Sequence, residues 1–289
     1  KLLEILAFIL LVPAAIAWHE CAASGWAGAL VHPAFFGFVI AIVTAYFGGA
    51  LCKALGSNIM RGNGIREGFA IVTFGWVILS FFGSFPLFTY FLAQAEALTA
   101  AAVFESFTNA YFEIMSGFTT TGATILTNIE VLPRGILFWR SLTHWLGGMG
   151  IVTLALAILP VFGIASYQMF QGEVPGPSAE QLKPRLAQTA KILWGTYGLL
   201  TLAETILLKI GGMSLFEALC HAFGTMATGG FSTRNASIAS FNSPFIEWVI
   251  IAFMFFAGTN FIIHYRIFFT GKFDLVKGNR EFHFYVTVI

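Results

Sequence analysis

A run of threonines that ends in a glycine, Thr119 to Gly122, contains the residue types best suited to chemistry in this sequence. Threonine hydroxyls and backbone carbonyls are oxygen ligands that can replace the water shell of a cation in a membrane pore. Gly122 permits backbone angles that other residues resist, so a loop at this position can turn its carbonyls inward. The pattern indicates coordination of a cation and no covalent chemistry.

The position of this run depends on the segment that precedes it. The large apolar residues before it recur at spacings of three and four, which predicts a helix. They are Phe104, Phe107, Tyr111, Met115 and Phe118. A helix of about fourteen residues reaches roughly 20 Å, less than the 30 Å of a hydrocarbon core, so we expect it to enter a membrane and turn back. Its partly negative C-terminal end would then face the loop, which also favours a cation.

The composition is that of a membrane protein. The chain has 289 residues, of which 57% are hydrophobic and 10% are charged, and its mean hydropathy is +0.81. These values predict an all-α membrane protein with several spans. A net charge of +1 gives no support for a nucleic-acid partner. Cys21, Cys52 and Cys220 lack the spacing of a metal site, and we interpret them as packing residues.

Apolar segments of spanning length occur throughout the chain. We expect a turn from His19 onward on the outer side and an aqueous loop at residues 161–188. The expected helices cover residues 2–18, 32–55, 69–92 with a kink at Pro86, 134–160 and 189–208.

The short helix and its loop recur further along the chain. Ser214 to Gly230 predicts a second short helix that ends at Thr-Gly, followed by a spanning helix over residues 244–269. Aligning Thr121-Gly122 with Thr228-Gly229 makes the two copies match. The sequence therefore predicts two units of helix, pore loop and helix. The expected domains are an N-terminal helix pair with its connector (1–67), a first repeat (68–165), a second repeat (166–282) and the start of a third (283–289).

Basic residues gather in segments that an alternating topology places on one side, which predicts that this side is cytoplasmic and that both pore loops open outward. They are Lys53, Arg61, Arg66, Lys183, Arg185, Lys191, Lys272, Lys277 and Arg280.

Three ionisable residues lie within apolar segments and are functional candidates for that reason. Arg140 and His144 lie four apart on one helix face; alternatively, Arg140 extends to the outer interface and His144 donates to a neighbouring carbonyl. Glu113 either pairs locally and supports the loop, or adds negative field near it.

The sequence resembles the Trk/Ktr/HKT superfamily of potassium transporters, in particular the bacterial TrkH-type membrane subunit. The resemblance covers essentially the whole chain. Its most specific part is the run Trp145 to Gly150 after a TTTGA loop, and it rests on residues Glu113 to Thr124, Arg140 to Ile151 and His221 to Thr233.

The resemblance implies a fold similar to fused potassium-channel subunits, with an extra N-terminal transmembrane helix pair. It implies potassium uptake through a filter, with potassium as the bound ion and no enzymatic activity. It further implies a multi-pass protein of the bacterial inner membrane in contact with lipid, a homodimer, and a cytosolic nucleotide-binding regulatory subunit of the TrkA type. The implied filter residues are Thr120, Thr121, Gly122, Ala227, Thr228 and Gly229.

This chain departs from the family pattern because only two of four repeats are present, so we expect it to be the N-terminal portion of a longer subunit. A secondary transporter that couples a small solute to sodium or protons through broken helices is the alternative. Its repeats are often inverted, whereas these two have the same sense. An intramembrane hydrolase would need a placed nucleophile and base, and the sequence has no GxSxG motif or paired intramembrane Asp.

Overall fold

The structure, a computed structural model, is helical in every regular element that it describes. No strand occurs within the described ranges, which confirms the predicted all-α fold. The chain divides into two compact units, Lys1–Gly147 with Phe231–Ser237 and Gly148–Gly230 with Ile238–Ile289. The described residues are 2–22, 32–56, 65–150, 179–259, 261, 263–264, 267 and 280–288.

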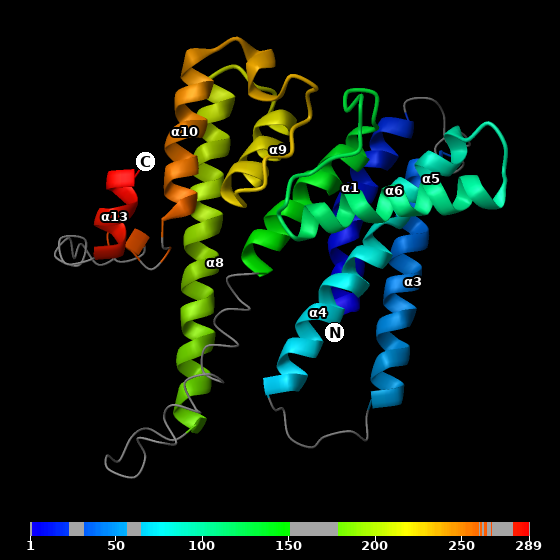
Figure 1. The fold of residues 1–289 in the computed structure, drawn as a ribbon, viewed down its shortest axis with the longest axis horizontal. Helices are drawn as coiled ribbons and strands as arrows, with labels where there is room; N and C mark the ends of the chain where they lie inside the picture. The colour runs from blue at the N-terminus through cyan, green and yellow to red at the C-terminus, as the bar shows by residue number, and fades with distance from the viewer. Residues whose placement is uncertain are drawn as a thin grey trace. The chain divides into compact units, whose positions relative to one another are not determined.

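Two long apolar helices begin the first unit, α1 (Leu2–Ala22) and α3 (Pro33–Gly56), and they pack against each other (Figure 1). Both are long and apolar enough to cross a membrane. Lys53 near the end of α3 pairs with Glu4 near the start of α1 at 2.6 Å, so the two helices are antiparallel. The first two predicted helices are therefore confirmed, and both have the length and the apolar composition of a membrane span.

The turn predicted from His19 onward is wrong for its first four residues, because α1 continues through Ala22. No helix breaker occurs in this stretch, and Glu20 has a structural role. Its carboxylate accepts a hydrogen bond of 2.8 Å from the backbone amide of Arg134, the first residue of the helix over residues 134–150. That amide has no partner within its own helix, so Glu20 satisfies it.

The single kinked span predicted over residues 69–92 consists of two helices, α4 (Ile65–Gly83) and α5 (Phe85–Gln94). Their axes differ by 41°. Pro86 lies in the first turn of α5, where its missing amide costs nothing. At the break, the carbonyl of Gly83 accepts a 2.8 Å hydrogen bond from Trp139 Nε1, so the interrupted backbone is satisfied by a buried side chain.

The helix before the first loop, α6 (Ala100–Phe118), is longer than predicted. It begins after Thr99, whose hydroxyl accepts a hydrogen bond from the amide of Ala102. Its 19 residues correspond to about 28 Å, so the length argument for a half-span is wrong. The helix α6 differs from the two long apolar helices in its direction, because it runs across α3 in Figure 1.

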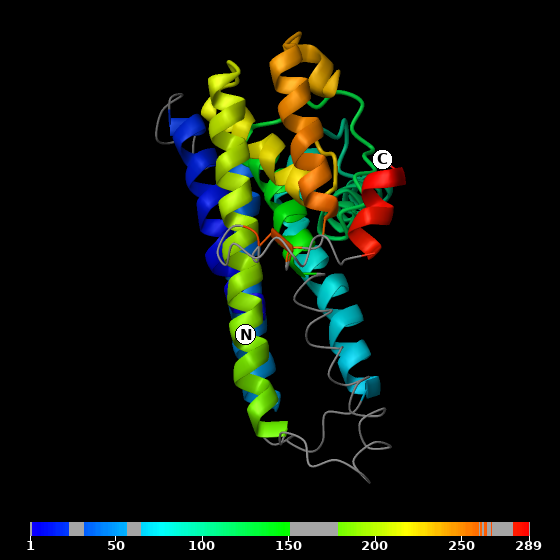
Figure 2. The same ribbon diagram turned by 90° about the vertical axis from the view of Figure 1, so that its left-hand side faces the viewer.

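The second unit contains α8 (Ala179–Ile210), α9 (Leu215–Met226) and α10 (Pro244–Gly258). The helices α8 and α10 lie side by side in both views, and α9 packs against both (Figure 2). A 3₁₀ turn over Ser237–Phe241 precedes α10, and α13 (Arg280–Val288) follows it.

Two boundaries of the second unit differ from the prediction. The last ten residues of the expected aqueous loop, 179–188, are helical, because strong helix formers such as Ala, Glu, Gln and Leu dominate there. The second return helix, predicted over residues 244–269, breaks after Gly258, and the described residues 261, 263, 264 and 267 beyond the break are helical again. The hydroxyl of Tyr285 lies against Gly258, and the Thr259 hydroxyl bonds back to the Phe255 carbonyl at 2.9 Å.

The cysteine prediction is confirmed for Cys21 and Cys220, which are buried, and is wrong for Cys52, which is exposed. Of the basic residues that predict the orientation, Arg61, Lys272 and Lys277 lie outside the described residues.

Candidate functional site

The first loop begins with a tight reversal at the end of α6. Thr120 has φ +53° and Gly122 has φ +73°, so two left-handed residues flank Thr121. The amides of Thr120 and Thr121 bond back to the carbonyls of Gly117 and Ser116, each at 3.0 Å. Positive φ is unusual for a β-branched residue such as threonine, and such strain concentrates at functional sites.

The second loop has the same conformation at the end of α9. Thr228 has φ +54° and Gly230 has φ +86°, and Gly229 lies between them. The amides of Thr228 and Gly229 bond back to the carbonyls of Thr225 and Gly224, each at 2.9 Å. The two loops therefore share one backbone conformation, which is consistent with the repeat predicted from the sequence.

The conformations correct the alignment of the two loops by one residue. Thr120 matches Thr228 and Gly122 matches Gly230, whereas the sequence alignment had paired Thr121 with Thr228. Ala227 is the residue that caps α9 and corresponds to Thr119, the cap of α6. Gly230 was missed by the sequence reasoning, although the shared pattern Thr-x-Gly could have indicated it.

The side chain of Glu113 supports the first loop through hydrogen bonds. Its carboxylate accepts hydrogen bonds from the Thr124 hydroxyl at 2.8 Å and from the Ile125 amide at 3.1 Å. It also forms an ion pair with Arg140, and both side chains are buried. Local pairing is therefore the arrangement of Glu113 in the structure.

The interfacial alternative for Arg140 and His144 is wrong. The Arg140 guanidinium is buried, so it does not extend to the outer interface. His144 is also buried, and among the described residues neither ring nitrogen has a hydrogen-bond partner. Its ring stacks on Phe231 with centroids 3.9 Å apart. Both residues pack inside the first unit.

Glycines allow the helix over residues 134–150 to approach the residues just before each loop closely. A side chain at Gly147 would collide with the carbonyl of Phe118, the last residue of α6. In the second unit, a side chain at Gly148 would lie 3.0 Å from the Cα of Ala227. Both contacts therefore depend on the absence of a side chain at these two glycines.

Glu204 on α8 is a buried ionisable residue that the sequence did not indicate as part of a functional site. Its carboxyl is fully buried, and neither oxygen has a hydrogen-bond partner among the described residues. Thr225, near the end of α9, lies beside it. The Thr225 hydroxyl donates to the carbonyl of His221 at 3.0 Å.

Comparison with known proteins places this arrangement in a family. Residues 32–286 match the TrkH family, described as a cation transport protein. The chain belongs to the TrkH family. The Trk system potassium uptake protein TrkH of Escherichia coli is 41% identical over 224 residues, which are 77% of this chain and 44% of that protein. The TrkH of Halomonas elongata is 42% identical, over 79% of this chain and 45% of its own length.

A solved structure agrees with this membership. The crystal structure of the potassium transporter TrkH from Vibrio parahaemolyticus has a TM-score of 0.64 and 33% identity to this chain. The match covers 94% of this chain and 53% of that one. This TrkH-family chain thus spans about half the length of the solved structure and less than half of the two curated relatives.

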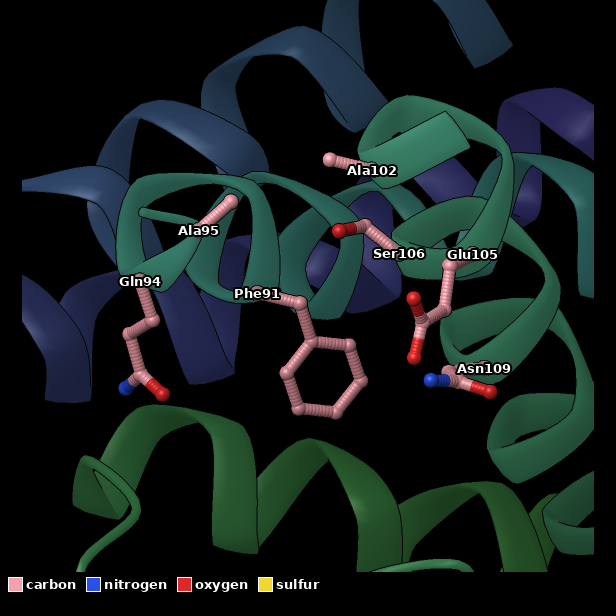
Figure 3. Close-up of a pocket in the computed structure, with 7 residues that line it drawn as sticks. All are labelled: Phe91, Gln94, Ala95, Ala102, Glu105, Ser106 and Asn109. Atoms are coloured by element: carbon pink, nitrogen blue, oxygen red, sulfur yellow. The ribbon is translucent and has the colours of Figure 1, made fainter. Parts of the chain in front are cut away.

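A hollow of about 220 Å³ lies between the end of α5 and the start of α6 (Figure 3). Its polar groups and aromatic floor come from Phe91, Gln94, Glu105, Ser106 and Asn109. Ser106 lies thirteen residues before Thr119, about 20 Å along the helix, so this hollow is separate from the loop of the TrkH-family chain. No metal-binding group of three His, Cys, Asp or Glu residues occurs in the described part.

Proposed function

We propose that this chain is part of a potassium-uptake protein, in which the loops after α6 and α9 are two segments of one selectivity filter. The recurring conformation of the two loops supports this assignment most directly: a left-handed threonine, one residue between, and a left-handed glycine. The names of the relatives, potassium uptake proteins and a potassium transporter, supply the ion.

The proposed filter residues are Thr120, Thr121 and Gly122 in the first loop and Thr228, Gly229 and Gly230 in the second. Ala227, predicted as a filter residue, would contribute as the cap of α9. Alternating left-handed and ordinary residues turns successive peptide planes so that their carbonyls emerge on one side. Such carbonyls, with the threonine hydroxyls, would replace the water shell of potassium. The negative ends of α6 and α9 would add field for a cation.

Permeation needs binding that is favourable enough to admit the ion and weak enough to release it. Two loops cannot surround an ion, and we expect the other segments of the filter to come from sequence that corresponds to the other half of the relatives. No bond to the ion is made or broken covalently, so the protein's contribution is the geometry of the oxygens.

The setting of the filter follows from the same proposal. The loops would face outward from the bacterial inner membrane, with the basic connectors in the cytoplasm. We further propose a homodimer and a cytosolic nucleotide-binding regulatory subunit of the TrkA type. Apolar helices α1 and α3 would meet the lipid.

Ion flux tests the proposal. The full-length protein in liposomes should take up potassium in preference to sodium, and Gly122→Ser should reduce that preference because serine resists φ +73°. The matched control is Gly195→Ala, since a side chain at Gly195 meets nothing within 4 Å. Flux that is unchanged by Gly122→Ser would remove this loop from the filter, and solute uptake that requires a sodium or proton gradient would support the secondary transporter.

A further inference from the structure

The guanidinium of Arg140 contacts groups that support both loops. Its Nε atom pairs with Oε1 of Glu113, the carboxylate that holds Thr124 and Ile125 just after Gly122. The first loop therefore depends on a carboxylate whose only charged partner among the described residues is Arg140.

The same guanidinium holds the residues that directly follow Gly230. Its Nη1 atom donates to the carbonyl of Ser232 at 3.0 Å. The guanidinium carbon lies 3.7 Å from the centroid of the Phe231 ring, close enough for a cation–π interaction. His144, one turn further along the same helix, stacks on that ring with only 15° between the planes.

A second set of bonds holds the end of this segment. Asn235 accepts a hydrogen bond from the Ile129 amide at 2.7 Å and donates one to the Asn128 side chain at 2.9 Å. Its own amide donates to Glu130 at 3.2 Å. Residues 231–237 accordingly belong to the same compact unit as residues 1–147, whereas Gly230 belongs to the other unit.

We infer that Arg140 is a positioning residue that couples the two filter loops, by holding the Glu113 carboxylate of the first loop and the Phe231–Ser232 segment of the second loop at once. This inference rests on the proposed function, because it gives the two loops a shared role in one filter. Loops that line one ion path must hold their ligand oxygens at the same depth along that path. Because one guanidinium contacts both Glu113 and the Phe231–Ser232 segment, a shift of one loop would disturb the other.

Arginine is suited to this position and lysine is not. A guanidinium presents five N–H donors in a fixed planar fork, so Nε and Nη1 can serve two partners while the flat face packs on a ring. A lysine ammonium is a single point of charge on a flexible stem. Arg140→Lys should therefore keep the charge opposite Glu113 and lose the link to Ser232 and Phe231.

A double-mutant cycle on the full-length protein tests the coupling. Glu113→Gln and Phe231→Leu alter residues that both contact Arg140, and each alone should lower the potassium-to-sodium permeability ratio. If Arg140 couples the loops, the ratio in the double variant should differ from the product of the single effects by about threefold or more, as expected for residues in one network. Glu113→Gln combined with Phe38→Leu is the matched control, because Phe38 is an equally buried aromatic residue on α3.

Hydrogen exchange measures the same coupling without any ion flux. Glu113→Gln should raise amide exchange in a peptide covering residues 226–235 as well as in one covering 119–127, and Phe38→Leu should raise neither. Increased exchange confined to residues 119–127, or permeability effects that simply multiply, would overturn the inference. Coupled exchange in a protein without potassium selectivity would keep the inference about Arg140 and reject the filter.

Discussion

The carbonyl oxygen of Phe118 occupies the space that a side chain at Gly147 would need. Phe118 is the last residue of α6, and Gly147 lies on the helix that returns from the first loop. The end of α6 and the return helix are therefore in backbone contact directly beside Thr119, where the first loop begins.

Gly147→Ala should displace the end of α6. Overpacking a tight contact costs about 1–3 kcal/mol, and here the obstacle is backbone that cannot rotate away. We expect a lower melting temperature in detergent and reduced potassium uptake. Gly195→Ala is the control: it adds the same methyl group to a helix where nothing lies within 4 Å, so stability should stay equal or rise by about 0.5–1 kcal/mol. Equal melting temperatures for the two variants would contradict the contact.

Two adjacent glycines decide which alignment of the loops is correct. Gly230 has φ +86° and Gly229 has no positive φ. A side chain at Gly230 would meet nothing within 4 Å, so Gly230→Ala should cost about 1–2 kcal/mol through backbone strain alone. We expect it to lower the potassium-to-sodium flux ratio more than Gly229→Ala does. The reverse order would restore the alignment of Thr228 with Thr121.

The sequence could predict the helices and the repeat because both are local patterns. Apolar length revealed α1 and α3, and the recurring short helix with Thr-Gly revealed the two loops. It could not predict that α6 begins at Ala100, because small alanines carry no apolar periodicity and the start depends on the Thr99 cap.

The register of the loops could not be read from residue types either. Both Gly229 and Gly230 can adopt positive φ, and only the backbone distinguishes them. The network around Arg140 was hidden for another reason. Arg140 is separated by 27 residues from Glu113 and by 92 from Ser232, and such distant pairs are set by tertiary packing.

Two buried glutamates should respond differently to substitution by glutamine. Glu113→Gln removes an acceptor from Thr124 or Ile125 and leaves the Arg140 guanidinium buried without its carboxylate. Breaking a buried pair in this way costs about 3–5 kcal/mol. Glu204→Gln breaks no such contact, because neither of its oxygens has a hydrogen-bond partner among the described residues.

Thermal unfolding in detergent measures this difference. Glu113→Gln should lower the melting temperature clearly, and Glu204→Gln should change the free energy of unfolding by less than about 1 kcal/mol, as for a substitution that breaks no network. A large loss at Glu204 would mean that its carboxylate has a charged or hydrogen-bonding partner, and equal losses at both positions would contradict the special role of the Arg140 pair.

The start of α9 should affect stability and leave selectivity unchanged. Ser214 accepts a hydrogen bond from the Glu217 amide at 3.2 Å, and Glu217 reaches back to the Ser214 amide at 3.3 Å, which forms a capping box for α9. Ser214→Ala removes the cap and should cost about 1 kcal/mol. The loop begins at the other end of α9, twelve residues away, so the potassium-to-sodium flux ratio should stay that of the unmodified protein. A change of that ratio at equal stability would show that the whole of α9 moves with its cap, and would extend the filter support to the start of the helix.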